Sequence, residues 1–467
     1  MAVHALNALV GAFDRPGGVV LPPPIPLTPM PPLAAAPPVD AVSVFRGEDG
    51  SGFGVDPLEA FSERLLETPD TVDVLILVNV NPVYSHPAGG RLRQILEDIP
   101  MVVAISPFED ETSTVADFVL PSHVYLEKWQ GVTTPQGVAF STLGVGEPAI
   151  EPLYDTKDPA DTLLALANRV GGPVAEDLPW SSYEEYLRFR LEGLVISGEG
   201  SIVTGSFEES WVHFLEERGW RFLEQKTIED FWTDLLRESG WWNPVRSRGD
   251  WQRIFPTPSG KFEFSSQKLE QRLIEAGGGG EGGEVAPRQA LDRARILLGL
   301  GAGIDEVCMP HFEAPNFQGE GEVVLVPFRP ITARGSLASV SPMLMEMYGY
   351  PLLTEWQTWI ELAPQTAHEL RLGDGDEVAV EADDASFEAV VRIQPGSTPG
   401  VAHVPVGLGH RETFGAGGGV GANPLEVLSE SRDSLSGRRS LTTTRVRLRL
   451  IRRRPHGEPA PLFGGHA

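Results

Sequence analysis

Two continuous apolar runs of strand length, Val72–Val80 and Met101–Ser106, constrain the fold of this chain more than any other feature. Runs in which consecutive residues are mostly apolar, such as Val74–Val78 and Met101–Ile105, are typical of strands buried on both faces of a parallel sheet. Residues 88–98 between the two runs have the pattern of a helix, so the order predicts a βαβ unit. A third short run from Phe118 extends the same sheet. We therefore expect residues 40–175 to form a doubly wound, parallel-sheet α/β lobe.

The chain before the first apolar run contains a proline-rich segment. Residues 22–38 hold nine prolines in seventeen positions, which predicts an extended, polyproline-like conformation. We interpret residues 1–39 as an N-terminal remnant that ends in this stiff linker. A helix should follow over residues 56–67, because Asp56 can cap its N-terminus and Pro57 suits the first helical position.

The middle of the chain reads as helical and irregular. Within residues 176–275, the apolar side chains between Ile228 and Leu236 have the spacing of one buried helix face, and Thr227 can cap that helix. Residues 276–320 are interpreted as a glycine-rich linker region. The segment AGGGGEGGE lacks the preceding strand and the Lys-Ser/Thr ending that a phosphate-binding loop needs.

The last third of the chain has the pattern of a β-barrel. Alternating segments such as DEVAVEA, FEAVVRI and TRVRLRLI are separated by clusters of Gly, Pro and Asp. We expect residues 321–455 to form a compact barrel, followed by a tail over residues 456–467.

Charge and cysteine usage exclude several classes of function. The chain carries 37 Lys and Arg against 65 Asp and Glu, a formal net charge of −28, which would repel nucleic acid and anionic membranes. Cys308 is the only cysteine, so the chain can form no internal disulfide, Cys-rich zinc site or iron–sulphur cluster of its own. The histidines lack paired spacing, so we expect no metal site built by protein ligands, and no GxSxG motif supports a hydrolase.

No segment of the sequence predicts membrane insertion or export. There is no apolar run long enough for a membrane helix, and the first residues lack the pattern of a signal peptide. We therefore expect a cytoplasmic location.

Polar residues follow two neighbouring strands of the predicted sheet. Asn79 lies near the end of the first run, Asn81 follows it, and Ser106 ends the second run. The carboxyl ends of parallel strands lie at one rim of a sheet, where ligands commonly bind, so a nucleotide or phosphate could lie across these loops. The alternative is that Asn81 and Ser106 only satisfy the backbone of their turns.

Several motifs resemble, in order and spacing, segments of the molybdopterin oxidoreductases. They are NALVGAFDRPGG, LVNVNPVYSHP, ETSTVADFVLPSHVYLEKWQG, EPAIEPLYDTKDPADTLLALANRVGG and PTPSGKFEFSS. Further segments, WQTWIELAPQTAHELRLGDGDEVAVEA, PGVAHVPVGLGH and GVGANP, look like the six-stranded molybdopterin-dinucleotide-binding barrel of that family. The resemblance covers most of the chain except about residues 176–320.

The resemblance implies a bis(molybdopterin guanine dinucleotide) cofactor with molybdenum, shared with further protein segments. Catalysis would be oxygen-atom or hydride transfer coupled to electron flow. Carried over motif by motif, the cofactor-binding candidates are Asn81, Ser106, Lys128, Asp161, Arg334, Ser336 and Asn423. A Lys ammonium can neutralise phosphate and a carboxylate can accept from guanine N–H groups, whereas the alternative for Lys128 and Asp161 is an ordinary surface ion pair.

The chain also departs from the family pattern. Leu337, Ala338 and Ser339 stand where the family often has a His or Trp, and Ser106 stands where it often has Asp. The cluster-binding domain and the molybdenum ligand would lie upstream of Met1, and Cys308 is in the wrong region to replace that ligand. No catalytic residue is identified.

Three interpretations remain open at this point. The chain is one product of a split gene, a truncated version of a longer gene product, or a descendant that has lost the cofactor and kept the fold. TARGSLASVSPML and WQTWIELAP are similar to the large subunit of alternative complex III, a quinol-oxidising assembly whose molybdopterin fold lacks molybdenum. The resemblance implies three partners: an N-terminal half or catalytic partner chain, an iron–sulphur electron-transfer subunit and a membrane quinone-interacting subunit. With such partners, the periplasmic face of the inner membrane is the alternative location.

Overall fold

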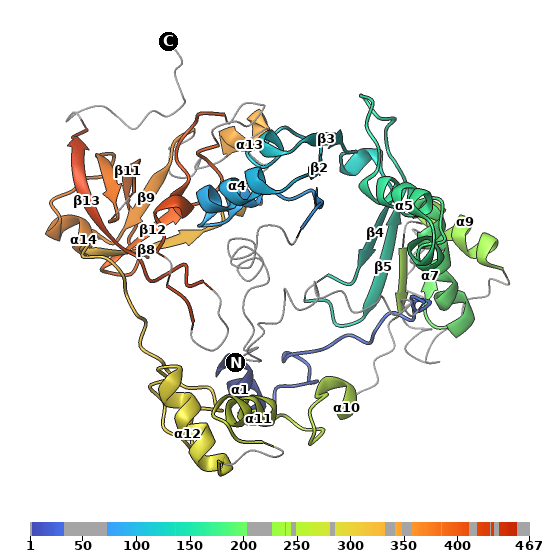
Figure 1. Ribbon diagram of the computed structural model, residues 1–467, viewed down its shortest axis with the longest axis horizontal. Coiled ribbons are helices and arrows are strands. Elements are labelled where there is room, and N and C mark those ends of the chain that lie inside the picture. The colour runs from blue at the N-terminus through green and yellow to red at the C-terminus, as the bar shows by residue number, and fades with distance from the viewer. Residues whose placement is uncertain are drawn as a thin grey trace. The chain divides into compact units, whose positions relative to one another are not determined.

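The computed structural model describes most of the chain and divides it into two compact units (Figure 1). The described residues are 2–31, 72–135, 137–202, 227–238, 240–243, 249–280, 285–331, 341–347, 356–383, 385–410, 418–429, 431–433 and 439–454. The first unit contains the described residues up to 31 and those of 122–297 and 302–312. The second unit contains those of 72–121, 298–301 and 313–454.

The second unit begins with the predicted parallel sheet. Its strands are β1 (Leu75–Val78), β2 (Val102–Ser106) and β3 (Phe118–Pro121), paired in the order β1-β2-β3. The helices α3 (Pro82–Ser85) and α4 (Gly89–Asp98) connect β1 to β2, and the 3-10 helix η3 (Ser113–Val115) lies between β2 and β3. Leu92, Ile95 and Leu96 of α4 pack against Val102 of β2. The βαβ unit and the parallel sheet are confirmed.

The rest of the second unit is the predicted β-barrel. Its strands are β8 (Val323–Phe328), β9 (Trp359–Leu362), β10 (Glu377–Glu381), β11 (Ser386–Ile393), β12 (Val401–Pro405) and β13 (Arg445–Arg452). They close in the order β10-β11-β9-β12-β8-β13. On β11, Phe387, Ala389 and Val391 are buried, whereas Ser386 and Glu388 are exposed. This alternation fills the barrel interior with apolar side chains, as the sequence pattern requires.

Short helices lie in the connections between the barrel strands. They are α13 (Pro342–Met347), α14 (Pro364–Glu369) and the 3-10 helix η8 (Pro424–Val427). Helix η8 begins directly after Asn423, whose side-chain oxygen accepts from the backbone N–H of Leu425 at 3.2 Å.

The first unit combines an antiparallel sheet with helices. Its strands are β4 (Gln130–Thr133), β5 (Ser141–Gly146), β6 (Ser201–Ile202) and β7 (Gly240–Asn243), in the order β4-β5-β7-β6. Its helices are α1 (Ala2–Leu9), η4 (Tyr125–Glu127), α5 (Pro159–Val170), α6 (Pro173–Asp177), α7 (Tyr183–Ser197), α9 (Ile228–Glu238), α10 (Trp251–Ile254), α11 (Gln267–Ala276) and α12 (Pro287–Leu297). Phe231, Trp232 and Leu235 of α9 are buried in the core, and the Thr227 hydroxyl accepts from the N–H of Asp230 at 3.1 Å. The predicted capped helix with a core-facing aromatic stripe is therefore confirmed.

Two regions differ from the sequence interpretation. The lobe expected over residues 40–175 is divided: its described residues up to 121 group with the barrel, and those from 122 onwards group with the first unit. The region 276–320, interpreted as a linker, contains α12, whose Ala290 and Ala294 are buried. The helix expected over residues 56–67 lies outside the described residues.

The described part of the proline-rich segment packs on the first unit rather than standing free as a linker. Ile25 and Leu27 lie against the core that α7 and α9 share, and the N–H of Thr28 donates to the carbonyl of Arg190 at 2.8 Å. At Gly193 of α7 a Cβ would lie 2.3 Å from the Thr28 nitrogen. This segment packs against the first unit because Ile25 and Leu27 are apolar and because Gly193 allows its backbone to approach α7 closely.

No helix in the described part of the chain has the length and apolar character needed to cross a bilayer.

Candidate functional site

A buried polar cluster lies at the carboxyl ends of β1 and β2 in the second unit. Asn79 adopts a φ of 51°, which Asn tolerates better than most residues, and turns the chain towards Asn81. The Asn81 side chain is 3% exposed; its amide nitrogen donates to Glu111 Oε2 at 2.7 Å. Its oxygen accepts from the Thr112 hydroxyl at 2.7 Å. The loops after the two strands therefore meet at one rim, as predicted.

His410 joins this cluster from the barrel. It follows β12, and its Nδ1 lies 3.0 Å from Glu111 Oε1 and 3.2 Å from Oε2. The imidazole stacks on the ring of Tyr84 with centroids 3.7 Å apart and an angle of 16°. The Tyr84 hydroxyl donates to the carbonyl of Leu408 at 2.8 Å, and the Asn423 amide donates to the carbonyl of Tyr84 at 3.0 Å. These contacts fix the barrel loops to helix α3.

The cluster holds a buried negative charge. Burial raises the pKa of Glu111, but the hydrogen bonds from His410 and Asn81 and the charge of His410 outweigh burial and lower this pKa to about 2. Glu111 is therefore ionised at neutral pH. Burial raises the pKa of Asp110 despite its hydrogen bonds from Ser113, and burial keeps the Tyr84 phenol neutral by raising its pKa.

One polar atom of the cluster lacks a partner. His410 Nε2 is buried and has no hydrogen bond within the described part of the chain. When Nδ1 donates to the carboxylate, Nε2 carries a lone pair in the neutral ring and an N–H in the protonated ring. An ordered water is the kind of group that such an atom accommodates.

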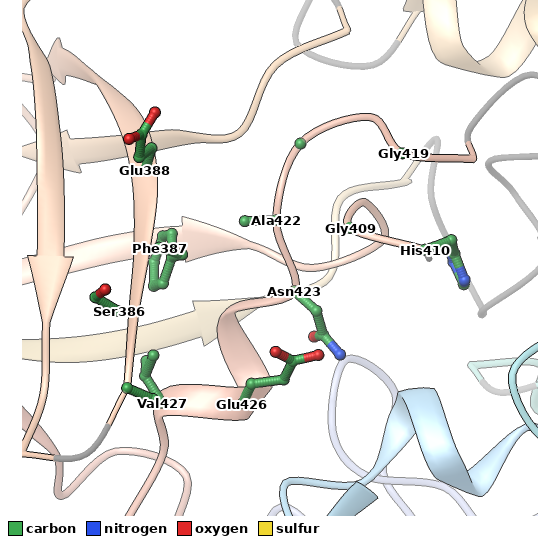
Figure 2. Close-up of a pocket in the computed structure, with 12 residues that line it drawn as sticks. Ser386, Phe387, Glu388, Gly409, His410, Gly419, Ala422, Asn423, Glu426 and Val427 are labelled. Carbon is green, nitrogen blue, oxygen red and sulfur yellow. The ribbon is translucent and has the colours of Figure 1, made fainter. Parts of the chain in front are cut away.

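A cavity of about 520 Å³ lies beside these loops on the barrel. Residues 385–388, which lead into and begin β11, form one wall, and Gly419, Gly421 and Asn423 belong to the other. Figure 2 shows Phe387 facing the loop that carries Ala422, with the His410 side chain pointing away from Phe387. The lining thus combines polar side chains with the apolar side chains of Phe387 and Val427.

Two glycines allow the cavity loops to cross closely. Gly409 has a φ of 81°, and a Cβ there would lie 2.0 Å from the nitrogen of Asn423. Gly421 has a φ of 67°, and a Cβ there would lie 2.7 Å from Thr358 Oγ1. That hydroxyl accepts from the N–H of Ala422 at 2.8 Å. A side chain at either glycine would push the loops apart.

Three of the predicted cofactor-binding residues lie in the second unit. Asn81 lies in the buried cluster, and Asn423 both caps η8 and lines the cavity. Ser106 is 7% exposed, and its hydroxyl donates to the carbonyl of Phe108 at 2.8 Å. Ser106 thus has the turn-satisfying contact of the alternative interpretation, whereas the Asn81 side chain bonds to the side chains of Glu111 and Thr112. The roles of Asn81, Ser106 and Asn423 towards a cofactor stay predictions.

Two other predicted residues lie in the first unit. The Asp161 carboxylate accepts from the N–H of Tyr183 at 2.7 Å, in the first turn of α7. Lys128 is half-buried and makes no ion pair within the described residues. The neighbouring Glu127 instead accepts from the N–H groups of Val124 and Leu153, each at 3.0 Å, and these hydrogen bonds lower its pKa.

Arg334, Ser336 and the departures at residues 337–339 lie outside the described residues.

Sequence reasoning missed Glu111, Tyr84 and His410 as members of the site. Glu111 and His410 are separated by 299 positions, so no local spacing connects them. Their positions could have indicated them, because Glu111 and His410 each follow a strand. Both also lie in segments that carry the family resemblance, ETSTVADFVLPSHVYLEKWQG and PGVAHVPVGLGH.

Comparison with protein families agrees with this geometry. Residues 46–169 match the family model described as Molybdopterin oxidoreductase, and residues 345–445 match the one described as Molydopterin dinucleotide binding domain. The two segments are therefore similar to two parts of molybdopterin oxidoreductases. The second match contains the cavity and His410.

Similar proteins come from several branches of this family. The chain is 23% identical to the arsenate respiratory reductase molybdopterin-containing subunit ArrA of Chrysiogenes arsenatis, over 94% of the chain and 54% of that protein. It is 31% identical to the menaquinone reductase, molybdopterin-binding-like subunit, of Nitratidesulfovibrio vulgaris, over 40% of the chain and 25% of that protein. Acetylene hydratase from Pelobacter acetylenicus has a similar fold, with a TM-score of 0.57, 18% identity, and 84% and 46% of the two chains covered. The chain therefore spans about half, or less, of the length of these relatives.

Proposed function

We propose that this chain forms the dinucleotide-binding part of a molybdopterin-dependent oxidoreductase in respiratory electron transfer. It would hold a bis(molybdopterin guanine dinucleotide) cofactor together with further segments of the protein or with a partner chain. The observation that carries the proposal is the barrel cavity, which lies within the residues that match the dinucleotide-binding domain. When bound, such a cofactor supplies oxygen-atom or hydride transfer through its molybdenum.

The residues of the cavity fit a nucleotide. Its volume of about 520 Å³ is that of a small-molecule site. Glu388 is exposed on its wall, and a carboxylate can accept from the ring N–H and amino groups of guanine. Ser386 and Asn423 add polar groups, and Gly419 leaves open space, since a Cβ there would meet nothing within 4 Å.

The buried cluster gives this cavity a fixed shape. The stacking of His410 on Tyr84, and the bond from Asn423 to the Tyr84 carbonyl, hold both cavity loops against α3. Loops that are already ordered lose less conformational freedom when a ligand binds. The ion pair between Glu111 and His410 is therefore assigned a positioning role rather than a chemical one.

The test is the cofactor content of the native assembly carrying variants of this chain. Ser386→Trp would fill the cavity from β11, and Arg449→Trp places the same side chain on β13, at a position that does not line the cavity. We expect the wild type and Arg449→Trp to release equal amounts of oxidised pterin and guanine nucleotide, and Ser386→Trp to release much less. Equal content in all three proteins would contradict the proposal.

The second candidate is a cofactor-free structural subunit of a quinol-oxidising respiratory complex. It is favoured by the 31% identical relative, whose name describes a molybdopterin-binding-like subunit of a menaquinone reductase. An intact assembly without pterin would support this candidate.

Partners and location follow from either candidate as proposals. Both need an iron–sulphur electron-transfer subunit, since the chain has one cysteine and cannot build a cluster itself. Both also fit a membrane subunit that interacts with quinone, and the first requires an N-terminal half or a catalytic partner chain. We propose a cytoplasmic location, with the periplasmic face of the inner membrane as the alternative.

A further inference from the structure

The first unit contains a cavity of about 410 Å³. Its lining comes from two parts of the chain that are far apart in the sequence, residues 8–15 and residues 249–262. A cavity of this volume fits a small molecule. None of its lining residues belongs to the site described above, so the ligand of this cavity is a separate question.

Four aromatic side chains line this cavity and hold one another in place. Phe13 packs edge-on against Phe255 with ring centroids 5.2 Å apart, and the ring of Phe262 lies 5.8 Å from that of Phe13. Trp251 is stacked on Phe255 at 6.0 Å with an angle of 4° between the rings. The Trp251 side chain is still 47% exposed, so the indole offers a flat apolar surface to a ligand.

Hydrogen bonds join the two parts of the lining. The carboxylate of Asp14, which is 7% exposed, accepts from the backbone N–H of Gly249 at 2.8 Å. The guanidinium of Arg253 in α10 donates to the carbonyls of Leu21 and Pro22 at 3.2 and 3.0 Å. The cavity is therefore formed before any ligand arrives, and binding costs little conformational freedom.

Two side chains of the lining present hydrogen-bond donors to a ligand. Arg15 is exposed and makes no ion pair or hydrogen bond within the described residues. Its guanidinium lies beside Gly11, where a Cβ would be 3.9 Å from Arg15 Cζ. The indole N–H of Trp251 likewise has no acceptor in the part of the chain that the structure describes. The cavity thus combines aromatic surface with a positive charge and a neutral donor.

We propose that this cavity binds a small planar aromatic carboxylate. The ring of the ligand packs on Trp251 and the phenylalanines, and its carboxylate accepts from the guanidinium of Arg15, whose paired N–H donors match two carboxylate oxygens. Aromatic rings alone would also attract an organic cation, but the charge of Arg15 disfavours one. This inference does not rest on the proposed function, because none of these residues is assigned to the dinucleotide.

The experiment measures binding of naphthoate to the full chain by equilibrium dialysis. Arg15→Gln removes the charge and Trp251→Leu removes the stacking surface; both side chains are substantially exposed, so neither variant should disturb folding. Arg169→Gln in α5 and Phe312→Leu are the matched controls, because both residues are exposed and neither lines the cavity. We expect Arg15→Gln to weaken binding about tenfold or more and Trp251→Leu about threefold or more, and the controls to leave it unchanged.

Three further probes test the chemistry of the ligand. Cyclohexanecarboxylate keeps the charge without the aromatic ring, and naphthylmethylammonium keeps the ring with the opposite charge; we expect both to bind more weakly than naphthoate. The proposal is overturned if either binds as tightly as naphthoate, if naphthoate does not bind, or if the control variants weaken binding as much as the cavity variants. Tighter binding of guanosine monophosphate than of naphthoate would assign the cavity to a nucleotide and would also overturn it. A native assembly that lacks pterin would contradict the proposed function but leave this inference standing.

Discussion

The substitution Glu111→Gln tests whether the buried cluster stabilises the barrel unit through its charge. The side chain keeps nearly the same size, so packing is preserved, but the negative charge that His410 and Asn81 contact is lost. Glu111 is 6% exposed, so solvent screens these contacts little.

The magnitude follows from the change in pKa on folding. The pKa of Glu111 falls from its ordinary value of 4.5 to about 2 in the folded protein. Linkage converts this difference into about 3 kcal/mol of stability at neutral pH. Because the folded-state pKa is the lower one, this stability is present above about pH 5 and is lost as the pH falls towards 2. At pH 3 about half of it remains.

The measurement is hydrogen exchange, followed by mass spectrometry on peptides from β2 and β12. These peptides report on the barrel unit alone, and a local readout is needed because proteins with two units seldom unfold in one step. At neutral pH we expect those amides to exchange at least about a hundredfold faster in Glu111→Gln than in the wild type, with the difference shrinking at pH 3. Glu377→Gln is the control, because its ion pair with Arg452 is exposed and should contribute less than about 1 kcal/mol. An effect of Glu111→Gln that matches the control, or that does not change with pH, would refute the reasoning.

Three further comparisons test other parts of the structure by hydrogen exchange on peptides from the unit that carries each substitution. Gly421→Ala should destabilise the barrel by about 2 kcal/mol or more, because its Cβ would clash with Thr358 and Leu408. Gly419 also has a positive φ, of 72°, but lies in open space, so Gly419→Ala should cost only about 1 kcal/mol. Similar effects of the two substitutions would contradict the packing of this loop. Leu194→Ala in the first unit should cost about 2 to 5 kcal/mol, since Leu194 is 0% exposed, and a loss below 1 kcal/mol would mean that the position is not core. Asp161→Ala should lower the stability of the first unit by about 1 kcal/mol, because the hydrogen bond from the N–H of Tyr183 is lost. Asp161→Asn keeps an acceptor and should lower the stability less. Equal losses of stability would show that the charge of Asp161, not its hydrogen bond, matters.

The sheet and the barrel could be predicted because their signals are local. The apolar run that contains Leu75–Val78 indicates a buried strand by itself, and the alternation in Ser386–Ile393 indicates one half-buried face. The boundary between the units could not be read in this way. Strand β5 pairs with β7, about a hundred positions further along the chain, and this pairing draws the residues after 121 into the first unit.

Part of the candidate site could also be predicted from local signals. Asn81 and Ser106 could be placed at one rim of the sheet because they lie at the ends of neighbouring parallel strands, which meet at one edge. His410 was not found, because a single histidine has no pattern of its own, and only the closed barrel brings it to Glu111 and Tyr84. The carboxylate of Asp161 accepts from the backbone N–H of Tyr183 at the start of α7, and its predicted role in guanine recognition stays a prediction.

Whether the barrel holds a molybdopterin dinucleotide can be measured from the cofactor content of the native assembly. The assembly would be purified from its source with its partners, its molybdenum measured by elemental mass spectrometry, and its pterin measured by fluorescence after oxidation. We expect about one molybdenum atom and two pterins for each copy of this chain. An intact assembly with neither metal nor pterin would contradict it and would favour the cofactor-free respiratory subunit.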